Sequence, residues 1–110
     1  MSYDYVIEMD AGGPEPIRVE GRNYTYNVSA MFYDACERAG GEWLGSSGTA
    51  NCGEIAPILE AAAKLIAEDA ERYEPMNPPN GWGNRIDAAE YLGGMAQMCR
   101  LYPKATIVMY

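Results

Sequence analysis

The sequence has 110 residues, of which 48% are hydrophobic, and its formal net charge is −8. This length suits one domain, residues 1–110, with a single modest core, and the apolar fraction excludes a disordered chain. An acidic surface repels phosphate backbones, so we expect no direct nucleic-acid binding. No apolar run approaches the roughly 18 residues that a membrane-spanning helix needs, so we expect no membrane partner.

Several kinds of chemistry are excluded by what the sequence lacks. It contains no histidine, which removes Ser-His-Asp and Cys-His nucleophile systems and histidine-based zinc sites. Its cysteines, Cys36, Cys52 and Cys99, show no Cys-x-x-Cys spacing, and we expect reduced thiols. The first residues lack the basic and apolar regions of a signal peptide, which indicates a cytoplasmic protein. We expect no metal, no cofactor and no catalytic residues.

The N-terminal part of the chain predicts a β-hairpin. Apolar and polar residues alternate over residues 3–9 and again over residues 16–20, the period of half-buried strands. The Gly-Gly-Pro segment at residues 12–14 breaks the first strand and supplies a longish loop. Residues 23–27 then predict an extended piece.

Three helices follow in the predicted order. Ser29 is a good N-cap for the first helix, which Gly40-Gly41 ends. The second begins between residues 50 and 54, with Asn51 and Glu54 as a capping pair, and ends at Glu74. The third follows the Asn84 cap and runs to Pro103; its internal Gly93-Gly94 pair suggests close packing of another backbone, or a bend.

The last segment, residues 105–110, predicts a strand that runs to the end of the chain. A terminal strand needs partners, so it should lie beside the first strand. The predicted fold is α+β: a three-stranded, mainly antiparallel sheet, made of two N-terminal strands and the C-terminal strand, covered on one face by three helices. The direction of the last strand relative to the first stays open.

Amide and aromatic side chains gather in two segments that each precede a helix. If the segments meet, they enclose a pocket with aromatic faces, hydrogen-bonding groups and little charge, which suits a flat polar ligand or a peptide segment. Alternatively, the asparagines satisfy exposed backbone groups at loop and helix ends, and Trp82 is either core or site. The candidate site residues are Asn23, Tyr24, Asn27, Asn77, Asn80, Trp82, Asn84 and Arg85.

Two charged features offer weaker hypotheses. Arg85 follows Gly83 at a helix N-terminus, where an anion could bind, but Asn84 could equally cap that terminus while Arg85 meets a surface carboxylate. Glu68, Asp69, Glu71 and Glu74 crowd the predicted C-terminus of the second helix, against its dipole. That run indicates either a basic partner or divalent ion, or simply a solvated face.

Three blocks of the chain resemble short, uncharacterised proteins of actinobacteria and their phages. The blocks are residues 23–31, residues 76–83 with the Asn-Pro-Pro-Asn-Gly-Trp-Gly motif, and residues 103–107. The resemblance covers most of the chain from residue 22 onward. That family has no established activity, so the resemblance supplies no catalytic residues; it implies a bacterial or phage setting in the cytoplasm.

Together these observations predict a non-enzymatic binding protein that acts on a host protein through its acidic surface and the Asn/Trp segment. The spread of acidic residues along all the helices favours a protein partner. Two alternatives stay open: a module that binds a small polar ligand, nucleotide- or base-like, and a carboxylate-based enzyme. The sequence does not determine the oligomeric state.

Overall fold

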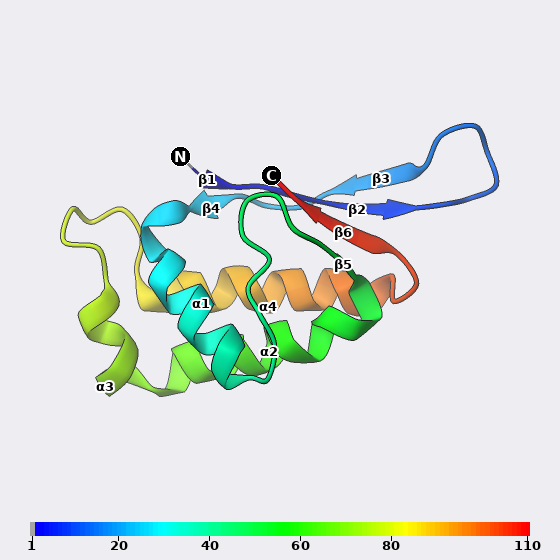
Figure 1. Ribbon diagram of the computed structural model, residues 1–110. Helices are drawn as coiled ribbons and strands as arrows, with labels where there is room; N and C mark the ends of the chain where they lie inside the picture. The colour runs from blue at the N-terminus through cyan, green and yellow to red at the C-terminus, as the bar shows by residue number, and fades with distance from the viewer. Residues whose placement is uncertain (1) are drawn as a thin grey trace.

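A layer of antiparallel strands lies on a layer of helices in the computed structural model, which describes residues 2–110 (Figure 1). This confirms the predicted α+β class. The strands are β1 (Ser2–Tyr3), β2 (Tyr5–Met9), β3 (Ile17–Glu20), β4 (Tyr24–Thr25), β5 (Thr49–Asn51) and β6 (Thr106–Met109). The helices are α1 (Ser29–Arg38), α2 (Cys52–Glu68), α3 (Ala70–Tyr73) and α4 (Arg85–Leu101), with 3₁₀ turns η1 (Tyr26–Val28) and η2 (Glu74–Met76).

The main sheet has four strands in the order β3-β2-β6-β5. β6 lies antiparallel to β2, with Ile107 opposite Ile7, so the C-terminal strand does join the N-terminal hairpin as predicted. The prediction of three strands is wrong, because β5 adds a fourth. We expected that segment to be loop and helix cap, but backbone bonds hold its two ends to β6: the Met109 N–H donates to the Gly48 carbonyl and the Cys52 N–H to the Ala105 carbonyl, both at 2.9 Å.

The predicted first strand, residues 3–9, is divided in the structure between two sheets: its start belongs to a small two-stranded sheet and the rest to the main sheet. Tyr3 of β1 pairs with Tyr24 of β4, whereas β2 begins only at Tyr5 and belongs to the main sheet. The extended piece predicted at residues 23–27 is therefore only two residues long. It ends because the Thr25 hydroxyl accepts the Asn27 N–H at 3.2 Å and starts the 3₁₀ turn η1.

The predicted helix ends are confirmed where side chains cap them. The Asn51 side chain accepts the Glu54 N–H at 2.9 Å at the start of α2. The start of α1 differs from the prediction: Ser29 is its first residue rather than its N-cap, because η1 leads directly into the helix. Its hydroxyl instead donates to the Tyr26 carbonyl at 2.5 Å. At the other end of α1, Gly40 has a φ of +92° and stops the helix, as expected.

The second predicted helix is broken after Glu68, so residues 2–110 form four α-helices rather than three. Asp69 has φ −98° and ψ 68°, and its side chain accepts the Arg72 N–H at 3.3 Å to begin α3. The change of direction lets Tyr73 reach α1, where its hydroxyl donates to Asp34 at 2.7 Å. Tyr73 is fully buried. The contact of Tyr73 with α1 therefore takes the place of the backbone hydrogen bonds that would have continued α2.

The core lies between the two layers and draws on both. Ile7, Phe32, Leu59 and Leu92 are completely buried, and α2 packs along α4 below the sheet (Figure 1). The close backbone packing suggested by Gly93-Gly94 is absent: a methyl group at Gly93 would lie 4.0 Å from the nearest heavy atom. Among residues 2–110, no helix is long and apolar enough to cross a membrane.

Candidate functional site

The two segments that carry the candidate residues meet in the structure. The Tyr24 hydroxyl accepts the backbone N–H of Asn84 at 3.0 Å, which joins β4 to the loop before α4. Gly83, with a φ of +107°, approaches so closely that a methyl group there would lie 2.8 Å from the Thr25 side chain and 2.9 Å from Val28. Glycine is needed for both reasons, its backbone angle and its small size.

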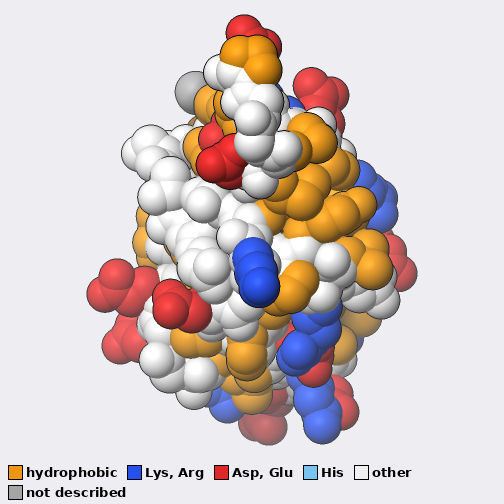
Figure 2. All heavy atoms as spheres, turned by 90° about the vertical axis from the view of Figure 1, so that its right-hand side faces the viewer, with side chains coloured by type: hydrophobic (Ala, Val, Ile, Leu, Met, Phe, Trp, Pro, Cys, Tyr) orange, Lys and Arg blue, Asp and Glu red, His pale blue; other side chains and the backbone are white. Residues whose placement is uncertain are grey.

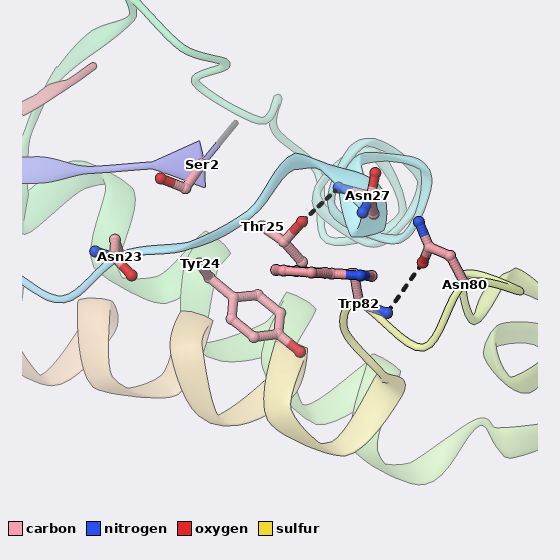
Figure 3. Close-up of a pocket in the computed structure, with 7 residues that line it drawn as sticks. All are labelled: Ser2, Asn23, Tyr24, Thr25, Asn27, Asn80 and Trp82. Atoms are coloured by element: carbon pink, nitrogen blue, oxygen red, sulfur yellow. Dashed lines mark hydrogen bonds between the residues drawn. The ribbon is translucent and has the colours of Figure 1, made fainter.

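An open hollow of about 620 Å³ lies between these segments (Figure 3). We call it the Trp82 hollow. β1, β4, η1 and the loop before α4 all contribute to it. Its lining residues are Ser2, Asn23, Tyr24, Thr25, Asn27, Asn80 and Trp82.

Trp82 reaches across the opening of this hollow toward the β4 segment (Figure 3). Its side chain is held out by a tight loop in which Gly81 has a φ of +77° and the Asn80 side chain accepts the Trp82 N–H at 3.0 Å. The residue is 67% exposed. A tryptophan on a loop held in this way offers a large, amphipathic contact surface at low entropic cost.

The core tryptophan of this protein is Trp43. It is 5% exposed and packs against Phe32 and Tyr3, with ring centres 4.7 Å and 5.1 Å apart. The Leu44 side chain beside it is partly buried and also packs on the core. Of the two alternatives for Trp82, core or site, the structure excludes the core, because Trp82 is exposed.

Among residues 2–110, no formally charged side chain lines the Trp82 hollow. Tyr24 is half-buried and stacks on Tyr91, with ring centres 5.6 Å apart. Burial raises the pKa of the Tyr24 hydroxyl above its usual value of 10, so it stays neutral at physiological pH. Asn23 and Asn27 are exposed and complete a rim of amide groups. The surface is therefore aromatic and polar without charge.

Three of the eight candidate residues serve the loop itself and do not line the hollow. Asn77 accepts the Arg85 N–H through its side chain at 2.8 Å. Asn84 caps α4 by accepting the Asp87 N–H at 2.9 Å. Arg85 donates to the Ala67 carbonyl at the end of α2 at 2.7 Å and to the Glu74 carboxylate at 2.8 Å. These contacts hold the loop between α2 and α4.

Two lining residues, Ser2 and Thr25, were not among the candidates. Thr25 lies within the motif of residues 23–27, and its hydroxyl is one of the hydrogen-bonding groups of that segment. Ser2 reaches the hollow only because β1 pairs with β4, with Ser2 opposite Thr25. Nothing in the sequence around Ser2 signals this position.

Two residues of the acidic run at residues 68–74, which begins at the end of α2, form ion pairs. Asp69 pairs with Arg38 at 3.1 Å, and Glu74 pairs with Arg85 at 2.8 Å. Within residues 2–110, no group of three or more potential ligand side chains could hold a metal ion. The run therefore contributes to the connection between helices.

Asp34 has the most strongly altered carboxyl group of those described, but it lies outside the hollow. Arg72 donates to it twice, at 2.6 and 2.7 Å, and Tyr73 adds a third hydrogen bond. These contacts lower the pKa of Asp34 to about 2. A general acid needs the opposite shift, so this network joins α1 to α3 rather than offering a proton donor.

Two of the other hollows are larger than the rest and lie away from Trp82. One, of about 540 Å³, is lined by Tyr33, Glu37, Gly41, Glu42 and Trp43. The other, of about 370 Å³, lies where the β2–β3 hairpin overhangs the end of α4, and Figure 2 shows hydrophobic side chains gathered beneath the hairpin. Met9, Asp10, Tyr102, Pro103, Lys104 and Ala105 line it.

Comparison with known proteins gives no relative for this chain: no family model, no curated protein and no solved structure matches it.

Proposed function

We propose that this protein is a non-enzymatic binding protein that recognises a segment of another protein at the Trp82 hollow. The observation that carries the proposal is the 67% exposure of Trp82 on a loop that hydrogen bonds and glycine geometry hold in one shape. Fixed aromatic residues surrounded by polar groups supply much of the binding energy of protein interfaces.

The shape of the hollow favours a macromolecular partner. Sites for small molecules usually bury most of the ligand surface, whereas this hollow is open along one side and has Trp82 at its rim (Figure 3). An inserted side chain or a short extended segment of a larger partner would be covered by the partner itself. The amides of Asn23, Asn27 and Asn80 can bond to its backbone groups.

Charge adds a preference for a basic partner. The chain carries a net charge of −8, and such a field accelerates encounter with a positively charged surface. The hollow itself is neutral, so charge acts on the rate of association while Trp82 anchors the complex. In the bacterial or phage setting that the sequence resemblance implies, the partner would be a cytoplasmic host protein.

A second candidate is a small, uncharged, flat ligand such as a nucleobase. Its support is the volume of about 620 Å³, which lies within the usual range of about 300–1,000 Å³ for ligand pockets. Trp82 would stack on one face of the ligand, and the asparagine amides of the rim would form hydrogen bonds with the polar groups along its edge. Carboxylate-based catalysis is not part of either proposal, because no Asp or Glu lines the hollow.

Photo-cross-linking distinguishes a protein partner from a small ligand. A photoreactive residue replaces Asn23 at the rim, which is exposed, and, as a control, Leu101 on α4, which is 69% exposed and is not among the residues that line the hollow. Each protein is irradiated in bacterial lysate at low and high salt. Bound proteins and small molecules are then identified by mass spectrometry.

We expect a protein cross-link from position 23 that is absent from position 101 and stronger at low salt. The Trp82→Ala substitution should remove it, and Leu101→Ala should leave it unchanged. A cross-link that survives Trp82→Ala would contradict the proposal. Recovery of a stoichiometric small molecule without a protein would replace it with the second candidate.

A further inference from the structure

β3 forms one edge of the main sheet and lies away from the Trp82 hollow. Among the described strands it pairs only with β2. Ile17, Arg18 and Glu20 are exposed and Val19 is half-buried. The hairpin that carries β3 extends beyond the helices (Figure 1), so this edge is open to a partner.

The pairing register shows which backbone groups of β3 are free. Ile7 lies opposite Val19 and Glu8 opposite Arg18, and the Gly21 N–H donates to the Tyr5 carbonyl at 2.9 Å. Hydrogen-bonded and non-hydrogen-bonded pairs alternate along an antiparallel ladder, so Val19, like Gly21, bonds inward to β2. The N–H and carbonyl groups of Arg18 and Glu20 consequently point away from the sheet.

The side chains of β3 divide between the two faces of the sheet. Val19 lies on the face of Ile7, which is the core face. Arg18 and Glu20 lie on the other face, where Arg18 pairs with Glu8 at 3.1 Å. Glu20 forms no ion pair with any described residue. The edge therefore presents one positive and one negative side chain two residues apart.

We propose that β3 binds β3 of a second copy of this chain, antiparallel, with Val19 opposite Val19 across a twofold axis. In that register Arg18 of each copy lies opposite Glu20 of the other. These are the residues whose backbone groups are free, so each such pair exchanges both of its N–H···O=C bonds. The two four-stranded sheets then form one continuous sheet.

Charge complementarity selects this register and favours a second copy as the occupant. Opposite charges placed directly across a strand pair stabilise it, and like charges destabilise it. A twofold axis through Arg18 would place two arginines face to face, and one through Glu20 would place two glutamates together. Only the axis at Val19 pairs unlike charges on both sides while Ile17, which is 51% exposed, faces the small Gly21.

Charge variants of the edge test the proposal by sedimentation velocity from micromolar to millimolar concentration. Glu20→Arg keeps the Glu8–Arg18 pair but gives an all-basic edge. Glu8→Arg with Arg18→Glu reverses the internal pair and gives an all-acidic edge. Circular dichroism checks that both fold, and amide hydrogen exchange of the unmodified protein follows Arg18 and Glu20 as concentration rises.

We expect the unmodified protein to form dimers as concentration rises, each variant alone to stay monomeric, and an equimolar mixture of the two to form heterodimers. Exchange at Arg18 and Glu20 should slow as dimers form. A protein that stays monomeric at millimolar concentration would overturn the proposal. So would variants that dimerise as well as the unmodified chain, or a mixture that fails to associate.

Discussion

Replacing Trp82 with alanine should leave the fold nearly intact, whereas replacing Trp43 should not. A tryptophan hides up to about 250 Å² when buried, and Trp82 is 67% exposed, so it hides only about a third of that area, roughly 80 Å². At about 25 cal/mol per Å², the loss is about 2 kcal/mol. This is an upper limit, because unfolded chains also bury some apolar surface.

Trp43→Ala should cost about 3–5 kcal/mol, as for other large core aromatics, since Trp43 is 5% exposed and packs between Tyr3 and Phe32. Urea unfolding followed by far-ultraviolet circular dichroism measures both free energies, because that signal does not depend on the deleted rings. Equal losses for the two variants, or the larger loss at Trp82, would refute the assignment of Trp43 to the core and Trp82 to the surface.

Gly94→Ala should raise the free energy of unfolding by about 0.5–1 kcal/mol, because no described atom lies within 4 Å of the added methyl group. Gly83→Ala should lower it by at least about 1–2 kcal/mol, because φ there is +107°; urea unfolding distinguishes a gain from a loss. The pKa of Asp34 is about 2 against its usual 3.8, so its stabilising contribution is complete above pH 3.8 and disappears as pH falls to about 2. The stability difference between the unmodified protein and Asp34→Asn should shrink across that range in calorimetric scans, and a difference that does not change with pH would contradict the contact with Arg72. Burial raises the pKa of Cys36 to about 12, so Ellman's reagent should not modify it at pH 8 until the protein is unfolded.

The parts of the fold that followed from sequence are those with a strong periodic pattern. Alternation in residues 105–110 was enough to place β6 beside β2, because an apolar terminal strand needs a sheet. β5 was missed because Thr49–Asn51 is short and has no apolar alternation; bonds from segments distant in sequence determine its pairing. The break at Asp69 was missed for a similar reason. In the sequence, Tyr73 has the helical spacing of the apolar residues on the buried face of α2, and only its contact with Asp34 shows that the chain leaves the axis of α2.

The candidate site was predictable by residue type and location but not by role. Asparagine beside glycine and proline indicates a shaped loop, and the two segments do meet through Tyr24 and Asn84. Whether a given asparagine caps a backbone group or faces solvent depends on angles that the sequence does not encode locally. Asn77 and Asn80 lie three residues apart, and each accepts a backbone N–H inside the loop, from Arg85 and from Trp82, yet of the two only Asn80 also lines the hollow.

The indole N–H signals in a ¹⁵N-correlated NMR spectrum show directly whether a partner contacts Trp82. The two tryptophans give two such signals, assigned with a Trp82→Phe variant, and the captured partner is titrated into the labelled protein. If Trp82 anchors the complex, its signal shifts and saturates with the partner while the Trp43 signal stays in place. A partner that binds to saturation without moving the Trp82 signal would contradict this anchoring role.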